Sequence, residues 1–153
     1  VNAMNKIKDL ALDEILGEVV LEDKKPILGI CLGMQLLCNS SEEDGGAQGL
    51  GYVDAECRKF SKENLKVPHV GFNQVNSNPN TKLYDGLNEE NDVYFTHKLQ
   101  SNYDINQSIC HYGEDFIASY EIDNMVGTQF HPELSQTNGL QLLKNFIDKF
   151  LDA

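Results

Sequence analysis

The sequence predicts a single α/β domain in which a sheet lies between layers of helices, with strands added antiparallel at one side. Three observations favour this class. The N-terminal third of the chain has the order helix, short apolar strand, helix; the middle consists of short β-rich runs separated by turn residues; and the chain closes with an amphipathic helix. With 153 residues, the chain is long enough for one domain with a substantial core, which we expect over residues 1–153.

The first elements follow from apolar spacing and from breakers. Apolar residues at helical spacing predict a helix over residues 3–16, and Gly17 is its expected end. The apolar run 26–30 predicts a short buried strand, and a second helix is expected to open over residues 34–38. The acidic, glycine-rich segment 40–51 predicts a loop.

The rest of the chain predicts five strands and a final helix. The last two strands are expected to form a hairpin with its turn at Asp123 and Asn124. The five strands are predicted over residues 52–60, 67–75, 92–99, 116–122 and 125–130. The final helix is predicted over residues 139–151, with an apolar stripe formed by Leu140, Leu143, Phe146, Ile147 and Phe150.

Composition narrows the classes of partner. The formal net charge of -12 argues against binding to nucleic acid and to an anionic membrane surface. No apolar run approaches the roughly 20 residues needed to span a bilayer, and the first residues lack a signal-peptide core, so a cytoplasmic location is expected. Four cysteines and four histidines occur without CxxC or HxxxH spacing, so we expect no metal and no cofactor. Three of the cysteines are expected to be inert core residues: Cys38, Cys57 and Cys110.

The fourth cysteine, Cys31, stands between Gly29 and Gly33 in the segment GICLG. A strand that turns sharply into a helix can present one nucleophile at the turn, and this requires small neighbours two positions away. A thiol beside a helix N-terminus is also favoured as thiolate. The backbone N–H of Leu32 could then point at an oxyanion. The alternative is that Cys31 is a small core residue and that the glycines reflect packing.

A second segment, GTQFHPE at residues 127–133, favours the catalytic interpretation. A thiol nucleophile needs a base, and the base needs a third group to hold its tautomer. His131 and Glu133 are separated by one residue, and both can point to the same side as the chain leaves a strand. We therefore expect Glu133 to accept from one ring nitrogen of His131 while the other faces Cys31.

These segments resemble the class I glutamine amidotransferases. Within that family, KVPHVGFNQV at residues 66–75, VYFTHK at 93–98 and FHPELSQTNGLQLLKNF at 130–146 resemble the glutaminase subunit of imidazole glycerol phosphate synthase. The resemblance covers nearly the whole chain and implies the three-layer, flavodoxin-like fold of that family.

The resemblance also implies an activity. Cys31 would attack the side-chain amide of L-glutamine, His131 would move protons, and Glu133 would orient His131. Ammonia would pass to a separate synthase subunit of (β/α)8 type for histidine synthesis. The residues implied to contact glutamine are Gln35, Leu32, Gly33 and Lys98, and those implied to face the partner are Phe72, Asn73, Leu134, Ser135 and Gln136.

Three positions depart from the family pattern. Phe72 stands where Trp is usual, Leu134 where Lys is usual, and Lys98 where Ser or Thr is usual. These departures leave open a related glutaminase that feeds amino-sugar synthesis for surface polysaccharides. Two further alternatives are a catalytically impaired, partner-binding form of this fold and an unrelated thiol hydrolase that acts on a small ester or peptide.

The family normally begins with two strands and a Gly-rich loop that supplies a second oxyanion donor. The sequence opens at Val1 within what resembles the following helix, so we expect the fold to lack its first strands. Loss of one oxyanion donor costs on the order of 100- to 1,000-fold in rate. From this, we expect these 153 residues alone to turn over glutamine near background, with or without a synthase.

Overall fold

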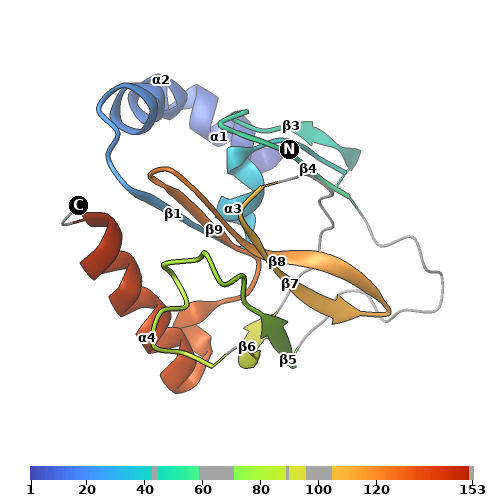
Figure 1. Cartoon of the computed structure of the whole chain (residues 1–153). Coiled ribbons are helices and arrows are strands. Elements are labelled where there is room, and N and C mark those ends of the chain that lie inside the picture. The colour runs from blue at the N-terminus through green and yellow to red at the C-terminus, as the bar shows by residue number, and fades with distance from the viewer. Residues whose placement is uncertain (43–44, 59–70, 89, 96–104, 152–153) are drawn as a thin grey trace.

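The computed structural model describes residues 1–42, 45–58, 71–88, 90–95 and 105–151 (Figure 1). Six strands form the main sheet in the order β1-β9-β8-β7-β5-β6, and three short strands form a second sheet in the order β3-β2-β4. In chain order the elements are α1 (Asn2–Asp9), α2 (Leu12–Leu16), η1 (Gly17–Glu22), β1 (Ile27–Ile30), α3 (Leu32–Leu37), β2 (Cys38–Ser41), β3 (Ala47–Gln48), β4 (Val53–Cys57), β5 (Gly71–Asn76), β6 (Glu90–Phe95), β7 (Gln107–Tyr112), β8 (Glu114–Ile122), β9 (Met125–Thr128), η3 (Pro132–Leu134), α4 (Gln136–Phe146) and η4 (Ile147–Leu151).

The main sheet combines one parallel pair with an antiparallel extension, which confirms the predicted class. Strands β1 and β9 are parallel, in a register that runs from Ile27 opposite Met125 to Ile30 opposite Thr128. The remaining pairs of this sheet are antiparallel. Helices α1 and α2 lie on one side of the sheet and α4 on the other, with α3 against the parallel pair (Figure 1).

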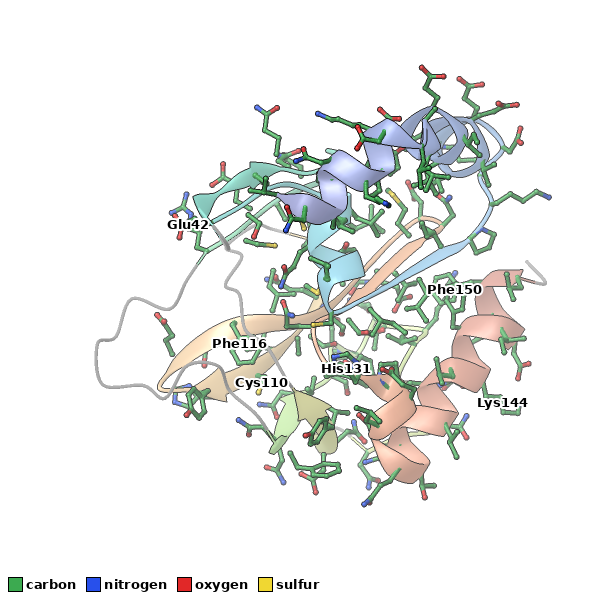
Figure 2. All side chains as sticks on the ribbon, turned by 180° about the vertical axis from the view of Figure 1, so that it is seen from behind. Glu42, Cys110, Phe116, His131, Lys144 and Phe150 are labelled. Atoms are coloured by element: carbon green, nitrogen blue, oxygen red, sulfur yellow. The ribbon has the colours of Figure 1, made fainter. Side chains whose placement is uncertain are left out.

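Two hydrophobic cores occupy the two faces of the sheet. Successive residues of β8 point to opposite faces, as strand geometry requires: Phe116 enters the core beneath α4, and Ile117 enters the core beneath α3. Phe150, from the last helical turn, closes the first core (Figure 2). Other members of the first core are Val75, Val93, Val126, Phe130 and Leu142; other members of the second are Val20, Met34, Leu37, Val53, Tyr120 and Met125.

A bulge interrupts the pairing of β7 with β8. Ser108 lies opposite Ser119 and Ile109 lies opposite Ile117, so Ala118 is an extra residue on β8. Extra residues of this kind bend a strand and redirect its neighbours. The carbonyl oxygen of Ala118 accepts a hydrogen bond from the backbone N–H of Gln129 at 2.7 Å, so the bulge contacts the segment that follows β9.

Several predicted boundaries were wrong at the N-terminal side. The first helix is broken at Ala11, whose φ is 54°, and the chain continues helically past Gly17 to Glu22. The segment 40–51, predicted as a loop, contains the end of β2 and all of β3. Strand β7 was missed. The predicted strand residues 59–60, 67–70 and 96–99 lie outside the described part of the chain.

The apolar stripe predicted for the last helix was partly wrong. Leu140 and Ile147 are exposed, whereas Leu142 and Asn145 are buried. The side-chain amide of Asn145 donates to the carbonyl oxygens of Leu83 and Asp85, both at 2.8 Å. A polar residue therefore takes a core-facing position because it satisfies backbone acceptors of the loop between β5 and β6.

Candidate active site

Cys31 occupies the sharp turn between β1 and α3. Its φ is 52° and its ψ is -106°, a backbone conformation that residues other than glycine rarely adopt and that is often found at functional positions. Cys31 is only 6% exposed. The backbone N–H of Cys31 donates to the carbonyl oxygen of Thr128 at 2.7 Å. The predicted sharp turn from a strand into a helix is therefore present at Cys31, and its role as a nucleophile stays a prediction.

The two glycines beside Cys31 have different roles. A Cβ atom on Gly29 would lie 2.7 Å from the carbonyl carbon of Gly33 and 2.8 Å from the backbone nitrogen of Met34, too close for any side chain. A Cβ atom on Gly33 would meet nothing within 4 Å. The prediction that the turn sterically requires both glycines was therefore right for Gly29 and wrong for Gly33, which borders open space.

His131 and Glu133 are brought together directly after β9. The Nδ1 atom of His131 lies 2.5 Å from Oε1 of Glu133. The backbone N–H of His131 donates to the carbonyl oxygen of Tyr94 at 2.8 Å, and Pro132 begins the short helix η3, which turns Glu133 back toward the imidazole. In Figure 2, His131 lies between the sheet and helix α4. The predicted His–Glu contact is present.

The parallel pairing of β1 with β9 places Cys31 and His131 at one edge of the sheet. Cys31 is the first residue after β1, and His131 is the third residue after β9. Since neighbouring parallel strands end at the same edge, both side chains follow the carboxyl ends of β1 and β9, the two strands at one side of the main sheet, and α/β proteins commonly carry their sites at such carboxyl ends.

The segment after His131 is held by buried contacts. Ser135 is 1% exposed; its Oγ donates to the carbonyl oxygen of His131 at 2.6 Å and accepts from the backbone N–H of Tyr94 at 2.9 Å. The expectation that the Ser135 side chain faces a partner was therefore wrong. A Cβ atom on Gly139 would lie 1.8 Å from the carbonyl oxygen of Pro132, so only glycine allows α4 to pack against this segment.

Residues predicted to contact glutamine lie on and around α3. Gln35 is 3% exposed, and its Oε1 atom has no partner among the described residues. Leu32 is half exposed, and its backbone N–H, as the first of the helix, has no acceptor within the helix. Both residues line a pocket together with Met4 from α1. Lys98 lies outside the described residues.

Sequence reasoning missed Gln129, which contacts Cys31. This residue is fully buried, and its Nε2 lies 3.7 Å from Sγ of Cys31. Its Oε1 lies 3.5 Å from Nε2 of Gln35. The signal that could have found it is its place in GTQFHPE: a polar residue between a buried strand and a buried phenylalanine needs a partner.

Three of the residues predicted to face a partner, namely Phe72, Leu134 and Gln136, are exposed where β5 lies near the start of α4. Phe72 and Leu134 are each about half exposed, and Phe72 packs edge-on against Tyr94 with 5.4 Å between ring centroids. Gln136 is exposed at the start of α4 with φ of 53°. A groove beside them is lined by Phe72, Asp92, Ser135, Gln136, Thr137 and Asn138. Asn73 is partly buried, and its amide donates to the carbonyl oxygen of His111 at 3.2 Å.

Two of the remaining cysteines and one tyrosine, namely Cys38, Cys57 and Tyr120, pack in the core beneath α3, whereas Cys110 lies in the core beneath α4. All three cysteines are buried, and none of them forms a disulfide. Contact with Cys57 lowers the pKa of the Cys38 thiol, against the opposing effect of burial. Burial raises the pKa of Tyr120 well above its usual range, so its hydroxyl stays protonated and donates to the carbonyl oxygen of Met34 at 3.0 Å.

The described part of the chain supports neither a metal site nor a membrane-spanning helix. Across the described ranges, His, Cys, Asp and Glu side chains form no group of three that could hold a metal ion. Among the same residues, no helix combines the length and the apolar character needed to cross a membrane.

Comparison with known proteins adds a family to this geometry. The family model described as "Glutamine amidotransferase class-I" matches residues 13–150. The chain is 44% identical over 148 residues to the imidazole glycerol phosphate synthase subunit HisH 1 of Campylobacter jejuni strain RM1221, covering 95% of this chain and 74% of that protein. It is 41% identical over 150 residues to the corresponding subunit HisH 2 of Vibrio vulnificus strain YJ016, covering 96% and 70%.

A solved structure agrees at the level of fold. The chain is similar to a glutamine amidotransferase from Thermotoga maritima with a TM-score of 0.60 and 21% sequence identity, covering 97% of this chain. This chain spans 56% of the length of that structure. At this identity, the likeness describes the fold.

Proposed function

Because the chain belongs to the class-I glutamine amidotransferase family, we propose that it is the glutaminase subunit of an imidazole glycerol phosphate synthase. It hydrolyses L-glutamine to glutamate and ammonia, and the ammonia is used by a synthase subunit in histidine biosynthesis. The relatives named as subunits of that synthase, at 41–44% identity over about 95% of this chain, support this assignment. They favour the histidine pathway over amino-sugar synthesis.

The observation that carries the catalytic assignment is the contact between His131 Nδ1 and Glu133 Oε1, at the sheet edge where Cys31 sits in a positive-φ turn. A carboxylate on Nδ1 keeps the hydrogen on that nitrogen and leaves Nε2 as the basic atom. Acyl transfer by a thiol needs a base of this kind at the same site.

The first half of the proposed reaction forms a thioester. His131 takes the proton of the Cys31 thiol, and the sulfur attacks the side-chain carbonyl carbon of glutamine. The backbone N–H of Leu32 donates to the oxygen, which carries negative charge in the tetrahedral intermediate. The C–N bond then breaks, and His131 gives its proton to the leaving nitrogen, so that ammonia departs and the γ-glutamyl thioester remains.

The second half of the reaction returns the enzyme. Water gives a proton to His131 and attacks the thioester carbonyl, again with the oxygen facing the N–H of Leu32. The C–S bond breaks, His131 returns the proton to the sulfur of Cys31, and glutamate is released. Each half uses the same base, so the orientation that Glu133 gives to His131 matters in both.

Glutamine is proposed to lie beside α3. The unpartnered Oε1 of buried Gln35 supports this placement, because a buried acceptor without a donor is costly unless a ligand supplies one. The open space at Gly33 supports a substrate that passes close to the helix backbone. Lys98 is kept as a proposed contact from the family resemblance alone.

The synthase partner is proposed to be a (β/α)8 subunit that docks on the surface formed by Phe72, Asn73, Leu134 and Gln136. Two half-exposed apolar side chains beside a polar groove are typical of an interface centre with a polar rim. A cytoplasmic location fits this assignment, and the four cysteines, which form no disulfide, agree with a reducing compartment.

Purified protein with and without its cyclase subunit tests the proposal. In the protein extended by the family's first two strands and Gly-rich loop, glutamate and ammonia should appear in equal amounts from glutamine, faster with the cyclase loaded with its own substrate, and Cys31→Ala should abolish both products. Product formation that needs no cyclase and survives Cys31→Ala would contradict the assignment. Labelling by a general cysteine-reactive ester but not by a glutamine analogue would instead indicate the thiol hydrolase.

A further inference from the structure

Gln129 joins the nucleophile to the residue proposed to hold the substrate. Its side chain is fully buried, and its backbone N–H is fixed at 2.7 Å from the carbonyl oxygen of the bulge residue Ala118. From this fixed point its amide lies between two groups: Nε2 is 3.7 Å from Sγ of Cys31, and Oε1 is 3.5 Å from Nε2 of Gln35. Both partners lie more than 90 residues away in the sequence.

The chemistry of the sulfur sets the direction of this chain of contacts. The reactive form of a cysteine is the thiolate, which can accept a hydrogen bond but cannot donate one. The thiolate therefore requires the NH₂ group of Gln129 to face Cys31, and the oxygen of Gln129 then faces Gln35. An amide oxygen only accepts, so Gln35 must present its own NH₂ group to Gln129.

The last atom in the series is the Oε1 of Gln35. With the amide of Gln35 oriented in this way, Oε1 points away from Gln129, and it has no partner among the described residues although the residue is 3% exposed. An unpaired buried acceptor of this kind selects a ligand that carries an N–H donor. Glutamine carries two, its α-ammonium group and its side-chain amide.

We propose that Gln129 is a positioning residue that donates to the sulfur of Cys31 and, through the same amide orientation, leaves the Oε1 of Gln35 free to accept from a substrate N–H. This inference rests on the proposed function and adds a residue to it. The amide of Gln129 then determines both the hydrogen bond to the thiolate of Cys31 and the orientation of the acceptor on Gln35. A protein with ionised Cys31 therefore also has its acceptor for the substrate in place.

Removal of the donor tests the contact with sulfur without any need for glutaminase activity. In Gln129→Met, which is similar in length but has no N–H, the rate of Cys31 alkylation by iodoacetamide should reach half-maximum at a higher pH. We expect a shift of about one pH unit and a rate at neutral pH roughly five- to tenfold lower. Gln129→Glu, which adds a negative charge beside the sulfur, should shift the midpoint further in the same direction.

Matched controls separate this effect from general damage. Gln141→Met removes an amide from α4 whose partner is Asn145, and should leave the alkylation profile unchanged. Gln35→Met should raise the KM for glutamine while Cys31 keeps its profile. The three elements that meet at Cys31, namely β1, α3 and β9, carry no ionisable side chain, and His131 and Glu133 on the segment after β9 are retained in all these variants.

A measurement on the unmutated protein covers the case in which the Gln129 variants do not fold. The side-chain N–H signals of Gln129, followed by NMR, should titrate with the midpoint of Cys31 alkylation, and Cys31→Ala should abolish that titration. An unchanged alkylation profile in folded Gln129→Met would overturn the inference. So would Gln129 N–H signals that show the same pH dependence in the parent protein and in Cys31→Ala. Absence of glutamine hydrolysis by the extended protein, with the shifts intact, would instead count against the proposed function.

Discussion

The backbone N–H of Cys31 donates a hydrogen bond to the carbonyl oxygen of Thr128, 2.7 Å away. This bond continues the parallel ladder of β1 and β9 by one residue beyond the last paired positions, Ile30 and Thr128. It therefore fixes the nucleophile turn against the strand that leads to His131. Since strand pairing sets the relative position of the two segments, the proposed catalytic pair depends on the register of this ladder.

Cys31 is expected to be the thiol that reacts with a glutamine-like electrophile. The other three cysteines are buried at 2% exposure or less and lack the strained turn of Cys31. A diazo-ketone analogue of glutamine should add to Cys31 alone, as measured by mass spectrometry of the digested protein. Comparable labelling of Cys57 or Cys110 would show that the strained turn at Cys31 does not confer reactivity.

Glu133→Gln should lower glutamine turnover while the fold remains intact. The amide can still contact His131, but it no longer fixes the tautomer or balances the imidazolium charge. We expect kcat to fall by roughly 10- to 1,000-fold, less than in Cys31→Ala, with an unchanged melting temperature. A variant as active as the parent protein would show that a group other than Glu133 orients His131.

Gly29→Ala and Gly33→Ala form a matched pair with opposite expectations. The added methyl group at Gly29 meets backbone atoms at 2.7–2.8 Å and should reduce the free energy of unfolding by roughly 1–3 kcal/mol. At Gly33 it meets nothing within 4 Å, and alanine favours the helix by up to about 1 kcal/mol. Urea unfolding measures both values.

The same pair tests the substrate position. If glutamine passes beside Gly33, Gly33→Ala should raise its KM although the protein is at least as stable. Equal stabilities of the two variants would contradict the steric argument, and an unchanged KM in Gly33→Ala would move the substrate away from this helix.

The combined change Phe72→Ser and Leu134→Ser should weaken binding of the cyclase subunit. Both side chains are about half exposed beside the groove at the start of α4, and apolar anchors carry much of the energy of an interface. We expect the Kd, measured by calorimetry, to rise at least about tenfold. Leu10→Ser, at an exposed apolar residue between α1 and α2, is the control and should leave the Kd unchanged.

Local features of the site could be predicted from the sequence because they depend on neighbours in the chain. The turn at Cys31 needs Gly29 two positions before it, and the pairing of His131 with Glu133 needs only one intervening proline and a short helix. Both requirements depend only on residues that are close together in the sequence. Much of the order of helices and strands was predictable for the same reason, although β3 and β7 were missed. Single boundaries also moved where a positive φ at Ala11 or a π-helical turn replaced the expected break.

Contacts between distant segments were decided by the tertiary structure alone. Ser135 was expected to face a partner, yet it is buried, and its hydroxyl bridges the carbonyl oxygen of His131 and the N–H of Tyr94. Gln129 meets Cys31 because parallel strands bring residues 98 positions apart to one edge and a bulge at Ala118 holds its backbone. Strand register and bulges arise from pairing between segments, and a local pattern of residues carries no record of which segment will be the partner.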